Sequence, residues 1–225
     1  MGIVENLNSL RQSIGNANVK IVAVSKTHPA EMIKIVYEAD QRLFGENKVQ
    51  EMVSKYEQLK DLDIKWHLIG HLQTNKVKYI ISFVDMIHSV DSLKLLKEIN
   101  RLAEKGSLVI NCLLQFYIAK EETKFGLDYS EAEEILNSNE FKEMKNVRIC
   151  GVMGMASFSD NMELVRNEFR ELKQIFDKLK QNHFSHSEAF CELSMGMSSD
   201  WKIAVEEGST IIRVGSNIFG NRIYT

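Results

Sequence analysis

Eight short apolar segments recur along the chain, and each except the last is followed by a segment with helical character. They predict strands over residues 20–26, 42–47, 64–70, 85–90, 107–116, 146–155, 189–195 and 210–215. Near-continuous apolar strands that alternate with helices are typical of a parallel sheet covered by helices. Eight such units in 225 residues favour a compact (β/α)8 barrel of the TIM type over a doubly wound sheet.

The pattern between the strands predicts helices and sets the domain organisation. An extra N-terminal helix is expected over residues 4–14, before the first strand. Further helices are expected over residues 29–39, 48–59, 76–82, 91–105, 130–137, 162–181 and 200–207. No linker rich in Pro, Gly or Ser divides the chain, and Pro29 is its only proline. We therefore expect one α/β domain that spans residues 1–225.

Composition excludes several classes of partner. The formal net charge of −3 carries no overall electrostatic signature for nucleic acid. No apolar run reaches the ~20 residues that span a bilayer, and residues 1–14 are too polar for a signal peptide. A cytoplasmic protein without a membrane partner is expected. Cys112, Cys150 and Cys191 lie far apart in apolar runs without C-x-x-C spacing, which favours buried, reduced thiols.

Small and polar residues follow the last two predicted strands. The stretch "ELSMGMSSD" contains Gly196 and Ser198, and "IIRVGSNIFG" contains Gly215 and Ser216. The loops after strands seven and eight are the usual phosphate site of such barrels, because glycine lets the backbone approach an anion and serine adds donors. Ordinary caps and turns use the same residues. The two loops together favour a ligand that carries a phosphate.

Two cations are predicted to point toward the barrel interior. In the stretch "IVAVSKTHP", Lys26 shares the side-chain parity of Val22 and Val24. Arg213 has the parity of Ile211 in the last strand. A lysine that extends into water and an arginine paired with a core carboxylate are the alternatives. An inward lysine beside a phosphate site is the setting for a Schiff base with a carbonyl ligand.

Histidine and asparagine residues near strands two and three are further candidates. His67 and His71 are four residues apart, but a strand that runs into a loop does not bring that spacing together, so no metal site is expected. His67 either satisfies its hydrogen bonds in the core or faces the ligand. Asn47 is either a turn residue or a polar contact to the ligand.

Several motifs together resemble the pyridoxal phosphate homeostasis proteins, which are single-domain relatives of the N-terminal barrel of alanine racemase. The motifs are "AVSKTHP", "FGENKVQE", "WHLIGHLQTNK", "KFGL", "ELSMGMSSDWKIAVEEGST" and "IIRVGSNIFGNR". The resemblance extends over nearly the whole chain. It departs from the pattern at "THP", where a second lysine often precedes the proline. It also departs at "GVMGMASFSDN", which includes Met153 and has no proline.

The resemblance implies a cofactor and roles for individual residues. Pyridoxal phosphate would be held on Lys26 as an internal aldimine. Arg213 would face the pyridine nitrogen. Ser198, Gly215 and Ser216 would bind the phosphate. The remaining cofactor-binding positions that it implies are Asn47, His67 and Met197. No residue is assigned a catalytic role.

Three functions fit these residues. The first is a binding protein for intracellular vitamin B6 homeostasis, a monomer that stores pyridoxal phosphate or delivers it to apo-enzymes. The second is an amino-acid racemase of low activity, and the third is a class I aldolase. An arginine only donates, so the ring nitrogen it faces is a weak electron sink. The chain ends after the eighth strand, and neither Tyr117 nor Tyr224 is well placed as the second acid or base. We therefore expect a carrier rather than an enzyme.

Overall fold

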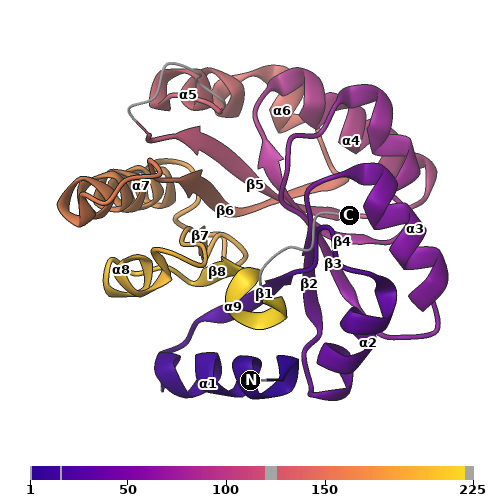
Figure 1. Cartoon of the computed structure of the whole chain (residues 1–225). Helices are drawn as coiled ribbons and strands as arrows, with labels where there is room; N and C mark the ends of the chain where they lie inside the picture. Colours follow the sequence, from indigo (N-terminus) through magenta and orange to yellow (C-terminus); the bar gives the residue numbers. More distant parts are fainter. Residues whose placement is uncertain (1, 16, 120–125, 221–225) are drawn as a thin grey trace.

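Eight parallel strands close into a barrel with helices around it (Figure 1). The computed structural model describes residues 2–15, 17–119 and 126–220. The strands are β1 (Lys20–Val24), β2 (Leu43–Glu46), β3 (Lys65–Leu68), β4 (Val84–Val90), β5 (Ile110–Tyr117), β6 (Val147–Met155), β7 (Glu192–Ser194) and β8 (Ile211–Val214). They are ordered around the barrel as in the sequence, and β1 pairs with β8 to close it. The predicted (β/α)8 fold is therefore confirmed.

The helices lie outside the strands, and most match the predicted ranges (Figure 1). They are α1 (Ile3–Ile14), α2 (Ala30–Glu38), α3 (Val49–Leu59), η1 (Thr74–Tyr79), α4 (Leu93–Lys105), α5 (Tyr129–Asn137), α6 (Asn139–Lys142), α7 (Met162–Asn182), α8 (Trp201–Glu206) and α9 (Ser216–Phe219). The element η1 is a 3-10 helix. Sequence reasoning missed α6 and α9, because four residues are too few to display a helical period.

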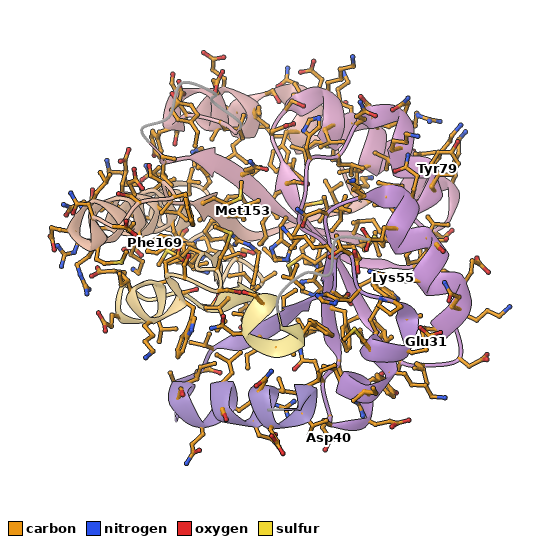
Figure 2. All side chains as sticks on the ribbon, viewed as in Figure 1. Glu31, Asp40, Lys55, Tyr79, Met153 and Phe169 are labelled. Carbon is orange, nitrogen blue, oxygen red and sulfur yellow. The ribbon has the colours of Figure 1, made fainter. Side chains whose placement is uncertain are left out.

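Two apolar layers hold the barrel together. The larger layer lies between strands and helices and includes Ala23 of β1 and Phe169 of α7. The smaller layer fills the barrel interior with Val22, Met86, Leu113, Cys150, Met153 and Ile211 (Met153 and Phe169 are labelled in Figure 2). Neighbouring residues of β1 thus face opposite layers, as side-chain alternation requires. Val24, the last residue of β1, has the inward parity of Val22 and lines a cavity at the barrel mouth.

The remaining features of the barrel are an ion pair at one end, the burial of the cysteines and the character of the helices. At the N-terminal end of the strands, Lys20 forms an ion pair with Glu192. Cys112 and Cys150 are buried as predicted, and burial raises the pKa of Cys150 to about 11. The prediction was wrong for Cys191, which is exposed because it precedes β7 rather than lying within it. Among the described residues, no helix combines the length and apolar character needed to cross a membrane.

Candidate functional site

A cavity of about 340 Å³ opens at the C-terminal ends of the strands. Its walls come from the ends of β1, β6 and β8 and from the loops after β1, β2, β3, β6, β7 and β8. The lining residues are Val24, Lys26, His28, Asn47, Ile69, Met155, Phe158, Met197, Ser198, Ser199, Arg213, Gly215, Ser216 and Gly220. Among the eight residues predicted from the sequence, the cavity brings together Lys26, Asn47, Met197, Ser198, Arg213, Gly215 and Ser216. Only His67 lies elsewhere.

The backbone on both sides of Lys26 is fixed by the neighbouring strand and by α3. The Ser25 N–H donates to the Gly45 carbonyl across the β1–β2 pair, at 3.1 Å. Thr27 has a φ of 68°, in the left-handed region, and its N–H donates to Glu51 Oε1 at 2.5 Å. A left-handed conformation is unusual for a β-branched residue and needs support from its surroundings. The Glu51 carboxylate provides that support next to Lys26.

A buried ion cluster lies directly behind this turn. Lys55 Nζ donates to Glu46 Oε1, Glu51 Oε1 and the Ser25 carbonyl, at 2.7 Å in each case. Ser25 Oγ donates to Glu46 Oε1 at 2.6 Å. Burial raises the pKa of Glu46 to about 7, although the Lys55 ammonium acts in the opposite direction. The cluster therefore connects β2 and α3 to the backbone that carries Lys26.

Sequence reasoning missed this cluster, although a signal for it exists. The buried face of α3 is formed by Val49, Met52, Lys55 and Leu59, so a lysine occupies one position of an apolar stripe. Figure 2 labels Lys55 between α3 and the strands, whereas Glu31 and Asp40 lie at the periphery. A lysine on such a stripe requires a buried acidic partner. The buried partner is Glu46, and Glu51, four residues before Lys55, is a second and partly exposed one.

The loops after β7 and β8 form one continuous wall. The Gly215 N–H donates to Ser198 Oγ at 3.2 Å, and Asn217 Nδ2 donates to the Ser198 carbonyl at 3.2 Å. Gly196 enables the first loop, since its φ is +94° and an added Cβ would lie 2.6 Å from the Cβ of Ala204. Ser198 is thus held beside the backbone of the second loop. Hydroxyls and backbone amides in such an arrangement suit an anionic group.

Arg213 closes the inner end of the cavity. Only 4% of its surface is exposed, and its Nη1 donates to Ser194 Oγ at 2.6 Å. Its Nη2 donates to the Gly154 carbonyl at 3.0 Å. Burial lowers the pKa of Arg213 to about 10, while Asp200 acts in the opposite direction. The guanidinium therefore remains charged at neutral pH and only donates hydrogen bonds.

The prediction that His67 contacts the ligand is not supported by its position. His67 is 2% exposed and does not line the cavity. Its Nδ1 lies 2.8 Å from His88 Nε2, and its Nε2 lies 3.6 Å from Asp85 Oδ2. The side chain follows the inward parity of β3 and contacts His88 inside the barrel rather than the cavity. His71 is mostly exposed and instead faces Asp91 at 3.4 Å.

Two ring-bearing side chains, His28 and Phe158, are among the lining residues that were not predicted from the sequence. His28 lines the cavity and stacks on Phe219, with ring centroids 5.0 Å apart. Phe158, in the loop after β6, also lines the cavity and is 92% exposed. Neither belongs to a strand, so strand parity gave no information about them. The short α9 that brings Phe219 to His28 was itself not predicted.

The sequence of this chain matches a family model and several known proteins. Residues 2–222 match the family described as "Alanine racemase, N-terminal domain". A pyridoxal phosphate homeostasis protein of Aquifex aeolicus is 41% identical over 95% of this chain and 92% of its own. One from Haemophilus influenzae is 34% identical over 100% of this chain and 98% of its own.

Solved structures show the same fold. PipY of Synechococcus elongatus PCC7942, solved with pyridoxal phosphate bound, has a TM-score of 0.87 and 38% identity over 97% of this chain and 100% of its own. An alanine racemase of Clostridium difficile 630 has a TM-score of 0.81 at 15% identity, over 98% of this chain but 59% of its own. The second comparison concerns the fold alone.

Proposed function

Because the chain belongs to the family of pyridoxal phosphate homeostasis proteins, we propose that it binds pyridoxal phosphate at the mouth of the barrel and takes part in intracellular vitamin B6 homeostasis. The observation that carries this proposal is that one cavity brings together Lys26, Arg213 and the loops after β7 and β8, which contain Ser198 and Ser216. Its volume of about 340 Å³ falls in the range of about 300–1,000 Å³ typical of small-molecule sites.

The lining residues fit the three functional groups of this cofactor. When bound, pyridoxal phosphate supplies an aldehyde that condenses with an amine and a ring that accepts electrons. The Lys26 amine would be the group that meets the aldehyde, and Arg213 would donate to the ring nitrogen. The hydroxyls of Ser198 and Ser216 and the loop at Gly215 would hold the phosphate. Asn47 and Met197 also line the cavity and would contact the ligand.

The chemistry of Arg213 favours a carrier over an enzyme. Since a guanidinium only donates, the ring nitrogen that it faces must accept and stays unprotonated. An unprotonated ring is a weak electron sink, which disfavours the carbanion chemistry of aminotransferases. The proposed carrier holds the cofactor reversibly and releases it to apo-enzymes without significant turnover, and we expect it to act as a monomer in the cytoplasm.

A low-activity amino-acid racemase is the second candidate. Racemisation needs an acid and a base on opposite faces of the α-carbon. His28 lines the same cavity as Lys26, so two titratable side chains border the proposed ligand. No tyrosine is among the lining residues in the part of the chain that the structure describes. This second function therefore depends on His28.

The test of the proposed function is a visible spectrum before and after borohydride reduction. The purified protein incubated with pyridoxal phosphate should show the absorption of a protonated Schiff base, and reduction should fix the ligand covalently on Lys26. Lys26→Ala should lose both signals, whereas Lys60→Ala, at an exposed lysine, should keep them. Peptide mapping that places the reduced adduct on another lysine, such as Lys76, would reject the assignment.

A further inference from the structure

A chain of buried polar side chains crosses the barrel interior beneath the cavity. It begins at Arg213, whose Nη1 lies 2.6 Å from Ser194 Oγ. Ser194 Oγ lies 3.0 Å from His88 Nδ1, and His88 Nε2 lies 2.8 Å from His67 Nδ1. It ends at Asp85 near the start of β4, whose Oδ2 is 3.6 Å from His67 Nε2. The last separation exceeds a hydrogen bond and is a contact between a dipole and a charge.

This row of polar side chains runs from the ligand cavity toward solvent at the opposite end of the strands. Ser194 and His88 are 0% exposed and His67 is 2% exposed. The Asp85 side chain is 36% exposed. The apolar residues of the interior layer surround these groups, so an unpaired donor or acceptor among them is destabilising. Each buried donor in this row therefore needs an acceptor, which restricts the directions that its hydrogen bonds can take.

The donor and acceptor role of each buried polar side chain follows from Arg213, at one end of the row. Arg213 can only donate, so Ser194 Oγ accepts from it. Within the described part of the chain, the one acceptor in reach of the Ser194 hydroxyl proton is His88 Nδ1. His88 then carries its proton on Nε2 and donates to His67 Nδ1. His67 in turn carries its proton on Nε2, which points toward the Asp85 carboxylate.

The charge states of the members agree with this direction. Burial lowers the pKa of His88 well below its usual value, and His67 and Arg213 lower it further, so His88 is neutral. The His67 N–H lowers the pKa of the Asp85 carboxyl, which is therefore ionised. Every O–H and N–H dipole then points from Arg213 toward Asp85. Outside this row of polar side chains, the negative charge of Asp200 raises the pKa of Arg213.

We propose that Ser194, His88 and His67 form a one-directional hydrogen-bond relay that is oriented by the Asp85 carboxylate and positions Arg213 for the ring nitrogen of its ligand. The relay makes Ser194 an obligate acceptor, which together with the Gly154 carbonyl holds two branches of the guanidinium. The remaining N–H groups of Arg213 are then presented to the cavity. This inference rests on the proposed function for the identity of the ligand, but the direction of the relay does not.

The direction of the relay is testable without ligand. In the apo-protein labelled with ¹⁵N-histidine, two-bond ¹H–¹⁵N correlations distinguish the two neutral tautomers. We expect His67 and His88 to carry the proton on Nε2 at neutral pH, and His88 to stay neutral at pH 6. A proton on Nδ1 of His88 would overturn the proposed direction, because both His88 Nδ1 and Arg213 would then donate to Ser194.

The positioning role is testable with two ligands that differ only at the ring nitrogen. Pyridoxal phosphate has a nitrogen that accepts, whereas N-methyl pyridoxal phosphate is permanently positive there and cannot accept. The wild type should bind the first ligand at least ~10-fold more tightly. Ser194→Ala should reduce this preference at least ~5-fold, since Arg213 loses one anchor.

Ser89→Ala is the matched control. It removes a buried hydroxyl from β4 next to His88, and that hydroxyl has no hydrogen-bond partner within the described residues. It should keep the wild-type preference. A Ser194→Ala protein with the full preference would overturn the positioning role. A wild type that binds neither ligand would instead overturn the proposed function, and the histidine tautomers of the apo-protein would still decide the direction of the relay.

Discussion

At the scale of single residues, the cavity assigns a different task to each side chain. Strand parity directs Arg213 inward on β8, whereas Lys26 lines the cavity from the turn after β1. Ser198 is placed by a hydrogen bond between two loops. His67 shows the limit of parity, because the side chain is inward and buried but does not line the cavity. Parity determines the direction of a side chain and not its depth.

Ser198 provides the first prediction at this scale. Ser198→Ala removes a hydroxyl that accepts from the Gly215 N–H and that we place against the ligand phosphate. The loss of one such hydrogen bond, worth about 1.4 kcal/mol, should weaken the binding of pyridoxal phosphate about tenfold. Fluorescence titration measures this effect. Pyridoxal, which has no phosphate, serves as the control ligand and should bind the variant and the wild type equally. An equal loss for both ligands would place Ser198 away from the phosphate.

At the scale of elements, α3 and β2 form a support for the loop after β1. Glu46 ends β2, and Glu51 and Lys55 lie on α3, so the three titratable side chains meet only when helix and strand are packed. Glu46 Oε2 is buried without a hydrogen bond among the described residues. Its burial explains why the carboxyl keeps its proton to a higher pH than usual.

This support predicts a pH dependence of stability. The pKa of Glu46 is raised from 4.5 to about 7, so between these values the unfolded chain is ionised while the folded protein retains the proton. The folded state therefore binds more protons, and the free energy of unfolding falls as pH rises from about 5 to about 7. One group contributes at most about 1.4 kcal/mol per pH unit.

Urea unfolding of wild type and Glu46→Gln at pH 5, 6 and 7 measures this contribution. The variant cannot ionise at this position, so its free energy of unfolding should fall less over the same interval. Glu31→Gln, at an exposed position on α2, is the control and should follow the wild type. Identical slopes for wild type and Glu46→Gln would show that Glu46 ionises normally in the folded protein.

At the scale of the whole molecule, the barrel separates a rigid interior from a mouth built by loops. The interior layer that includes Val22 and Met153 is apolar and lies around the relay, while the mouth carries His28, Phe158 and the loops after β7 and β8. Such a mouth can hold a ligand reversibly, and it can also place His28 near Lys26. Carrier and racemase therefore differ by whether a proton leaves the α-carbon of a bound amino acid.

Exchange of that proton separates the two functions. The protein loaded with pyridoxal phosphate is incubated with L-alanine in deuterated water, and deuterium at the α-carbon is followed by NMR. A missing acid or base costs roughly 10²–10⁴ in rate, so we expect at most trace exchange. Exchange on the order of 1 s⁻¹ or faster would favour the racemase. His28→Asn should then abolish it, whereas a carrier should show the same trace rate with and without His28.

The sequence by itself determined the barrel and most of its mouth. Eight apolar segments alternating with helical ones favour this fold over a doubly wound sheet, and period-two alternation predicted the inward direction of Arg213 on β8. Lys26 follows the end of β1 and reaches the cavity from the turn after that strand. These features are local, because the period of a strand or helix is written in neighbouring residues. The positions of Ser198 and Gly215 also followed, since the barrel fixes which loops meet.

Only the tertiary structure decided which buried polar groups meet. Ser194 and His88 are 106 residues apart, and Lys55 meets Ser25 across 30 residues. No local period encodes such pairs, because they depend on barrel closure and on the depth of each side chain. The same reason explains why His67 joined a relay with His88 rather than the cavity. Burial then makes each pairing obligatory, since an unpaired polar group inside the barrel is costly.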